Sequence, residues 1–396
     1  MVFTGRVISQ YSVIRRKNKI DNIKGSTMNC LLKNDGIKPI LIFPAGMPRS
    51  LEYLKKCNSE DVAVIGSSSL AYDVSKEEYP LWCYLPYITD PAFNEALRVA
   101  ILEFNIGSIY TPNPVAWNYL NQALKDINLN VALVNDWPVN DELSGYRAAI
   151  VNANKVLEHP LSIASKLTAK SSISQLEIAT LFRHGNVIPG MCDNEKISAL
   201  CDIIRYSPQG DLVEIGCWLG KSAFILARLA RCYDIGKTLC VDPWSSDHLV
   251  QNDKGALIDS CIEQYDCDEI FQMFEMNLLP YNANNINYLR MPSTEAAKYY
   301  CEHRTVTTVS FGTTDYCGHI AILHIDGNHS YDAAKADVLS WCDLVVKGGW
   351  IIIDDYIWPY GDGPQRAGDE FLAEHGNKID TAFVMGSALF IQLSLD

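Results

Sequence analysis

The chain has 396 residues, of which 48% are hydrophobic, 10% aromatic and 20% charged, and its formal net charge is −14. A domain of ordinary size has about 100 to 200 residues, so we expect two folded domains. No segment approaches the roughly 18 unbroken apolar residues of a membrane span, and a nucleic-acid partner is disfavoured because polyanion binding normally needs a basic face.

The first 36 residues are predicted to be a flexible basic leader. Residues 1–27 carry basic side chains against the single acid Asp21 and lack the apolar core of a secretory signal. They could be an organelle transit peptide or an extension before a second possible start at Met28. The thirteen cysteines are scattered and never form a Cys-x-x-Cys pair, which predicts reduced thiols in a cytoplasmic protein.

Residues 37–136 alternate between short apolar segments and helical patterns, which predicts a small parallel sheet covered by helices. The expected strands lie at 39–43, 62–65, 108–110 and 131–134, and the expected helices at 51–56, 91–104 and 114–126. Residues 137–205 are predicted to form a helical connector with helices near 173–182 and 195–204.

The N-terminal region resembles the Rossmann-like domain that precedes the ATP-grasp fold in carboxylate-amine ligases. The resemblance is carried by residues 87–93 (Tyr-Ile-Thr-Asp-Pro-Ala-Phe) and 109–112 (Ile-Tyr-Thr-Pro). No ATP-grasp domain follows, so nucleotide chemistry is not implied. A substrate-orienting or oligomerising module is expected, and a homo-oligomer is therefore considered. The segment 66–69 (Gly-Ser-Ser-Ser) predicts a strand-ending turn rather than a phosphate cradle.

A glycine turn follows the apolar segment 212–215 and opens a helical pattern at 223–230. Such a turn lets a ligand approach the backbone where the helix amides point outward. The next apolar segment ends in Asp242, and an acid at this place can accept hydrogen bonds from both hydroxyls of a ribose.

Three kinds of ligand site are considered for this turn. The dinucleotide-binding motif Gly-x-Gly-x-x-Gly needs its second glycine at the position of Trp218. A Walker turn needs four residues between its first glycine and Gly-Lys-Ser, but only three residues separate Gly216 from Gly220. The third pattern, Glu-x-Gly-x-x-x-Gly with an acid ending the second strand, resembles the S-adenosylmethionine site of class I methyltransferases.

This resemblance implies a role for each residue of the turn. Gly216 and Gly220 would border the methionine part, Glu214 would hold its amino group or the turn, and Asp242 would bind the ribose. Ser222 opens the following helix and belongs to the same expected cofactor site. Ser293 follows the third strand where this fold contacts adenine.

Ser293 could equally cap the helix at 295–300. The methyltransferase resemblance covers about residues 190–396, and we place the domain at 206–396. It implies an α/β fold, with a seven-stranded Rossmann-like sheet beside the smaller N-terminal α/β domain. The expected later strands lie at 286–290, 320–325, 350–354, 382–385 and 388–391, with a helix at 331–346 and a turn at 347–349.

Three aspartates stand at the ends of two apolar segments: Asp326 follows 321–325, and Asp354 and Asp355 follow 350–353. Carboxyl ends of neighbouring strands meet at one sheet edge, and carboxylates without thiolates suit Mg²⁺, Mn²⁺ or Ca²⁺. Alternatively, Asp354 caps a turn and Asp355 is solvated. His329 follows Asp326 by three residues and is a candidate general base or a loop-ordering residue.

The segment Asp-Gly-Asn-His at 326–329, followed at 348–356 by Gly-Gly-x-Ile-Ile-x-Asp-Asp-Tyr, resembles the Mg²⁺-dependent sugar O-methyltransferases of macrolide and aminocoumarin antibiotics. The resemblance implies that Asp326, Asp354 and Asp355 hold the metal and that His329 acts as the base beside the catalytic Asp326. Asn328 departs from the aspartate of the related Asp-Gly-Asp form.

The expected activity is that of a cytoplasmic O-methyltransferase that uses S-adenosyl-L-methionine and Mg²⁺ (or Mn²⁺). Its expected partner is a glycan, a glycosylated metabolite or another polyhydroxylated small molecule, with no nucleic acid and no membrane involved. Two alternatives remain. The segment 351–355 imitates a Walker B strand and would fit a P-loop-like nucleotide hydrolase, and the fold could serve a non-catalytic, cofactor-binding scaffold protein.

Overall fold

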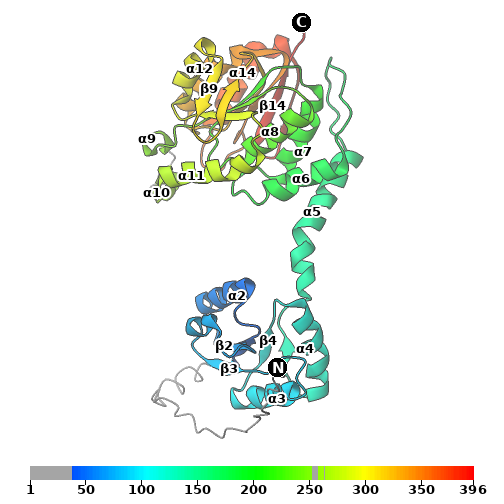
Figure 1. The fold of residues 1–396 in the computed structure, drawn as a ribbon. Coiled ribbons are helices and arrows are strands. Elements are labelled where there is room, and N and C mark those ends of the chain that lie inside the picture. The colour runs from blue at the N-terminus through cyan, green and yellow to red at the C-terminus, as the bar shows by residue number, and fades with distance from the viewer. Residues whose placement is uncertain (1–37, 252–256, 263) are drawn as a thin grey trace, which may run out of the picture. The chain divides into compact units, whose positions relative to one another are not determined.

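The computed structural model describes residues 38–251, 257–262 and 264–396, so the predicted leader at 1–36 lies outside the described residues. The chain forms two compact units that divide between Leu143 and Ser144 (Figure 1). Within the described ranges, no helix has the length and apolar character needed to cross a membrane.

The first unit contains a five-stranded parallel sheet in the order β3-β2-β1-β4-β5. Its strands are β1 (Ile40–Ile42), β2 (Val64–Ser68), β3 (Trp82–Tyr84), β4 (Ser108–Tyr110) and β5 (Ala132–Leu133). The small parallel sheet is as predicted. The strand β3 was not among those predicted.

Helices cover both faces of this sheet, namely α2 (Pro48–Ser59), α3 (Phe93–Glu103) and α4 (Pro114–Ile127), with the short 3-10 helix η1 (Val74–Glu78) after β2. The apolar sides of α3 and α4 pack with Leu41 and Ile109 in one cluster. Leu54 of α2 packs with Ile42 in another cluster. The sheet is therefore a buried layer between helices, as all-parallel sheets usually are.

The second unit contains a seven-stranded sheet in the order β13-β14-β12-β11-β6-β7-β8, in which only β14 runs antiparallel to its neighbours. This confirms the predicted seven-stranded fold. The strands are β6 (Asp211–Ile215), β7 (Thr238–Val241), β8 (Ile286–Leu289), β11 (Ile320–Ile325), β12 (Val345–Ile353), β13 (Ile379–Met385) and β14 (Ala388–Leu393).

The predicted turn at 347–349 is wrong, because these residues lie inside β12. The preceding helix, α13 (Tyr331–Trp341), ends earlier than expected and continues as the 3-10 helix η4 (Cys342–Leu344). The pairing of β12 with β11 shifts register beyond Val345, and Gly348 has a φ of 77°. The glycines therefore form an irregularity within the strand.

The helices predicted for the connector belong to the core of the second unit. Phe182 of α6 (Gln175–Gly185) and Ile197 of α7 (Asn194–Ile203) pack in one cluster with Ile225 of α8 (Lys221–Cys232). The longer α5 (Pro138–Glu158) crosses the division between the units.

The other elements of the second unit lie mainly in its connections. A hairpin, β9 (Thr305–Thr308) and β10 (Gly312–Asp315), was not predicted, and Asn287 donates hydrogen bonds to the carbonyls of Val306 and Gly312 in it. The remaining elements are η2 (Ile204–Tyr206), α9 (Ser246–Leu249), α10 (Leu257–Ile262), α11 (Cys267–Leu278), η3 (Leu279–Tyr281), α12 (Ser293–Glu302), α14 (Gly363–His375) and η5 (Gly376–Lys378).

Candidate functional site

The turn between β6 and α8 is held open by two glycines in the left-handed region, Gly216 at a φ of 78° and Gly220 at 87°. A Cβ on Gly216 would lie 1.9 Å from the carbonyl oxygen of Asp326. No other residue fits there, because real Cβ contacts are never so short. The turn expected to bind the cofactor therefore touches the loop that carries the first of the three aspartates.

Asp242 follows β7 and anchors this turn. Its Oδ2 accepts hydrogen bonds from the backbone N–H groups of Cys217 (2.9 Å) and Trp218 (3.1 Å), and its Oδ1 accepts one from Trp244 (2.8 Å). Burial raises the pKa of Asp242, and the three backbone bonds act in the opposite direction. The structure places Asp242 where it shapes the turn, while its contact with a ribose stays a prediction.

Glu214 is the last residue but one of β6 and lies directly opposite His324 of β11. Its Oε1 is 2.9 Å from Nδ1 of His324, and both side chains are at most 1% exposed. The other oxygen, Oε2, is buried without a hydrogen-bond partner among the described residues. An unpaired carboxylate oxygen beside the glycine turn fits an ammonium group, as the methionine part of S-adenosylmethionine would supply.

The buried pair continues into a row of alternating charges that sequence reasoning missed. Nε2 of His324 lies 3.3 Å from Oδ2 of Asp354, and that same oxygen accepts a hydrogen bond from Nζ of Lys196. Lys196 is in α7 and is 2% exposed. The row therefore runs from Glu214 through His324 and Asp354 to Lys196 and contains two acids and two bases.

The charges in this row support one another. Burial alone lowers the pKa of His324, but the hydrogen bonds and charges of Asp354 and Glu214 raise it to about 10. Burial also lowers the pKa of Lys196, and the charge of Asp354 reverses this and raises it. Burial raises the pKa of Asp354, but His324 and Lys196 together hold it well below its ordinary value.

A second cluster lies beside this row and reaches the surface. One side-chain oxygen of Asp326, one of Asp355 and a ring nitrogen of His329 lie within 4.8 Å of one another. Nε2 of His329 is 3.0 Å from Oδ2 of Asp355, and the backbone N–H of His329 donates to Oε1 of Gln251 (2.5 Å). The three side chains come from the loops after β11 and β12, as predicted from the strand ends.

Asp326 connects the surface cluster with the buried row. It also lies within 4.8 Å of ligand atoms of His324 and Asp354. Desolvation by the surrounding protein raises the pKa of Asp326 well above its ordinary value, and the charge of Asp354 raises it further. The carboxylates of Asp326 and Asp355 are hard oxygen donors of the kind that suits a divalent cation such as Mg²⁺ or Mn²⁺, so these two residues fit such an ion.

Asp354 is less accessible than the sequence suggested. Its Oδ2 is engaged by Lys196 and His324, and its Oδ1 accepts hydrogen bonds from the backbone N–H of Asp355 (2.8 Å) and the hydroxyl of Ser387 (3.2 Å). Asp354 could therefore join an ion through Oδ1 only by giving up one of these bonds, so its place among the metal ligands stays a prediction.

The two serines of the expected cofactor site lie at the starts of helices. Ser222 is buried in the first turn of α8. The prediction that Ser293 caps a helix is wrong, because Ser293 is itself the first residue of α12 and Pro292 occupies the cap position. The hydroxyl of Ser293 instead accepts a hydrogen bond from Nε1 of Trp341 at 2.8 Å. Its contact with adenine stays untested.

Residues 213–356 match a family described as a methyltransferase domain. This range begins in the strand before the glycine turn and ends just after Asp354 and Asp355. It therefore contains the turn and all three aspartates. The comparison with curated protein sequences found no match.

The solved structures that resemble the chain include the following three. The O-methyltransferase NovP is 18% identical over 64% of this chain and 99% of that chain, with a TM-score of 0.37. CalS11, a TDP-rhamnose 3'-O-methyltransferase of calicheamicin biosynthesis, is 14% identical over 65% and 96%, with a TM-score of 0.33. MycE of the mycinamycin pathway, in complex with Mg, SAH and mycinamycin VI, is 14% identical over 47% and 45%, with a TM-score of 0.27.

The sheet order, the glycine turn and the family match agree on one fold and disfavour the alternative of a P-loop-like nucleotide hydrolase. Residues 213–356 of the second unit therefore resemble a methyltransferase domain.

Proposed function

We propose that the second unit transfers a methyl group from S-adenosylmethionine to a hydroxyl oxygen of a sugar or another polyhydroxylated small molecule, assisted by a divalent cation. One observation carries this proposal: the cluster of Asp326, His329 and Asp355 lies next to the glycine turn, because Gly216 packs on the backbone of Asp326. A methyl donor in the turn and an acceptor at the cluster would then be neighbours.

The cofactor half of the site is assigned to residues around the turn. Glu214 offers the unpaired Oε2 to the amino group of the donor, and Gly216 and Gly220 let the donor approach the backbone. Asp242 keeps the turn in shape and faces the ribose side. We assign the adenine side to Ser293, and Ser222 supports the start of α8.

The acceptor half of the site is assigned to the aspartates. Asp326 and Asp355 would hold the cation at the surface cluster, and Asp354 would complete the set. A divalent cation held by these residues would orient neighbouring hydroxyls and would lower the pKa of the one that reacts.

His329 is assigned as the general base. Its Nε2 lies 3.0 Å from Asp355, within the cluster that an acceptor hydroxyl would have to reach. The hydroxyl oxygen attacks the sulfonium methyl carbon while the carbon–sulfur bond breaks and the sulfur keeps the electron pair. The hydroxyl proton passes to the imidazole of His329, whose Nε2 would be free to accept it once the carboxylate of Asp355 is engaged by the cation. Methylation is thus an in-line displacement that depends on the correct placement of both reactants.

The test is methyl transfer from labelled S-adenosylmethionine to a panel of sugars, glycosides and nucleotide sugars, with Mg²⁺ or with EDTA. We expect the labelled methyl group to be found in an ether linkage. We expect this transfer to be lost when EDTA is added and in the variant Asp355→Asn. Asp332→Asn is the matched control, since this exposed acid lies in the first turn of α13 outside the cluster. Label on nitrogen or carbon, or transfer that EDTA leaves unchanged, would overturn the proposal.

A further inference from the structure

The sheet of the first unit has a point at which its strand order reverses. From β1 the chain adds β2 and then β3 on one side, and it returns to place β4 and β5 on the other side. In open α/β sheets, ligands bind outside the carboxyl ends of the strands at such a reversal. The rule points to the space beyond the ends of β1 and β4.

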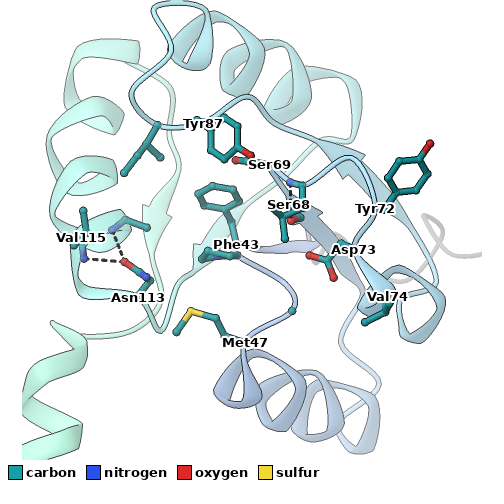
Figure 2. Close-up of a pocket in the computed structure, with 15 residues that line it drawn as sticks. Phe43, Met47, Ser68, Ser69, Tyr72, Asp73, Val74, Tyr87, Asn113 and Val115 are labelled. Carbon is teal, nitrogen blue, oxygen red and sulfur yellow. Dashed lines mark hydrogen bonds between the residues drawn. The ribbon is translucent and has the colours of Figure 1, made fainter.

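A cavity of about 630 Å³ lies at that place. Its lining includes Phe43 after β1, Ser68 and Ser69 at the end of β2, and Val115 at the start of α4 (Figure 2). Small-molecule sites in proteins commonly have volumes of about 300 to 1,000 Å³. The cavity therefore has both the position and the size of a ligand site.

The lining of the cavity restricts the chemistry of its ligand. Phe43, Met47, Tyr87 and Val115 provide apolar and aromatic walls. Among the described residues that line the cavity there is no lysine, arginine or histidine. A phosphate or carboxylate ligand would find no cationic side chain among these residues.

Asp73 provides the only acidic side chain among the described lining residues. Its Oδ1 accepts hydrogen bonds from the backbone N–H (3.0 Å) and the hydroxyl (2.6 Å) of Ser75. Burial raises its pKa, but the bonds from Ser75 and Ser68 lower it overall. A Cβ on Gly46 would lie 2.9 Å from Oδ1, so the loop after β1 passes directly beside this carboxylate.

We propose that the first unit binds a small molecule with an aromatic or apolar body and a protonated amine. The body would lie between Phe43, Met47 and Val115, and the amine would pair with Asp73. The residues of this site are different from those assigned to methyl transfer, and the proposal does not depend on the activity proposed for the second unit.

Two matched probes test the charge preference on the full chain by ligand-observed NMR. Tryptamine carries an indole and an ammonium group, whereas indole-3-propionate carries the same ring and a carboxylate. Tryptamine is expected to bind with a dissociation constant of about 1 mM, as a fragment of this size commonly does. Indole-3-propionate is expected to bind at least about tenfold more weakly. Equal binding of both probes, or no binding of tryptamine, would overturn the proposal.

Three variants test the place of binding. Asp73→Asn should weaken the binding of tryptamine by about fivefold or more and should remove the preference for tryptamine over indole-3-propionate. Val115→Trp should fill the cavity and abolish binding, and the substitution is tolerable because Val115 is 68% exposed. The control is Val99→Trp, on the exposed side of α3 and outside the cavity lining. Tryptamine binding that survives in Val115→Trp would place the ligand elsewhere and refute the assignment.

Discussion

Lys196 donates a hydrogen bond to Asp354 in a place where neither side chain is more than 3% exposed. The two residues are far apart in the sequence, and the bond ties α7 to the end of β12. His324 contacts the same oxygen of Asp354, so one carboxylate is held by two bases. Burying a charge without a partner is costly, so this bond should matter both for stability and for the position of the neighbouring aspartates.

Lys196→Met should destabilise the second unit by about 3 to 5 kcal/mol, because Asp354 would lose a buried partner. Urea denaturation followed by tryptophan fluorescence measures the change. Lys298→Met is the matched control, since Lys298 is exposed on α12. If both variants are equally stable, the bond between Lys196 and Asp354 contributes nothing to the fold.

Glu214→Gln should weaken S-adenosylhomocysteine binding by about tenfold or more, because a neutral amide replaces the carboxylate oxygen assigned to the amino group. Calorimetry with 5'-methylthioadenosine provides the comparison, since this ligand shares the nucleoside but lacks the amino-acid part. Its affinity should change little. An equal loss for both ligands would mean that Glu214 supports the site only through His324.

His329→Gln should lower the rate of methyl transfer by about a hundredfold or more if His329 takes the acceptor proton. S-adenosylhomocysteine affinity and Mn²⁺ binding, followed by electron paramagnetic resonance, should remain close to those of the unmodified chain. Near-normal turnover would reduce His329 to a residue that orders the loop through its contacts with Asp355 and Trp358.

Asp337 on α13 makes stability depend on pH. Burial raises its pKa from 3.8 to about 6, although a hydrogen bond from Ser293 acts in the opposite direction. The folded state therefore binds a proton that the unfolded state has already released. The stability that comes from this proton is fully present below pH 3.8 and is lost as the pH rises through about 6.

Asp337→Asn removes this dependence and should be more stable than the unmodified chain above about pH 6, by at most about 3 kcal/mol. Unfolding free energies of both proteins between pH 4 and pH 8 measure the difference, which should grow with pH. A difference that stays constant over this range would show that Asp337 does not titrate as its burial suggests.

The parts of the site that could be predicted are short segments whose residues are close together in the sequence. The glycine turn from Gly216 to Gly220 and the loop from Asp326 to His329 could be identified because each follows a short apolar strand. The meeting of Asp326 and Asp355 followed from the parallel arrangement of their strands.

The buried row of charges was not predictable, because it depends on contacts between distant segments. Glu214 and His324 meet only through the register of β6 against β11, and Lys196 reaches Asp354 only through the packing of α7. A signal existed all the same. A glutamate and a histidine within two otherwise apolar strands are rarely buried without partners. The cavity beside Asp73 likewise depends on how segments that are distant in the sequence come together.

The central claim is that the turn at Gly216 binds a methyl donor and that the neighbouring aspartates serve the acceptor. Calorimetric titration of the full chain with S-adenosylhomocysteine, and separately with a non-hydrolysable ATP analogue in the presence of Mg²⁺, tests this claim most directly. We expect S-adenosylhomocysteine to bind and the ATP analogue not to bind. Binding of the ATP analogue without binding of S-adenosylhomocysteine would contradict the claim.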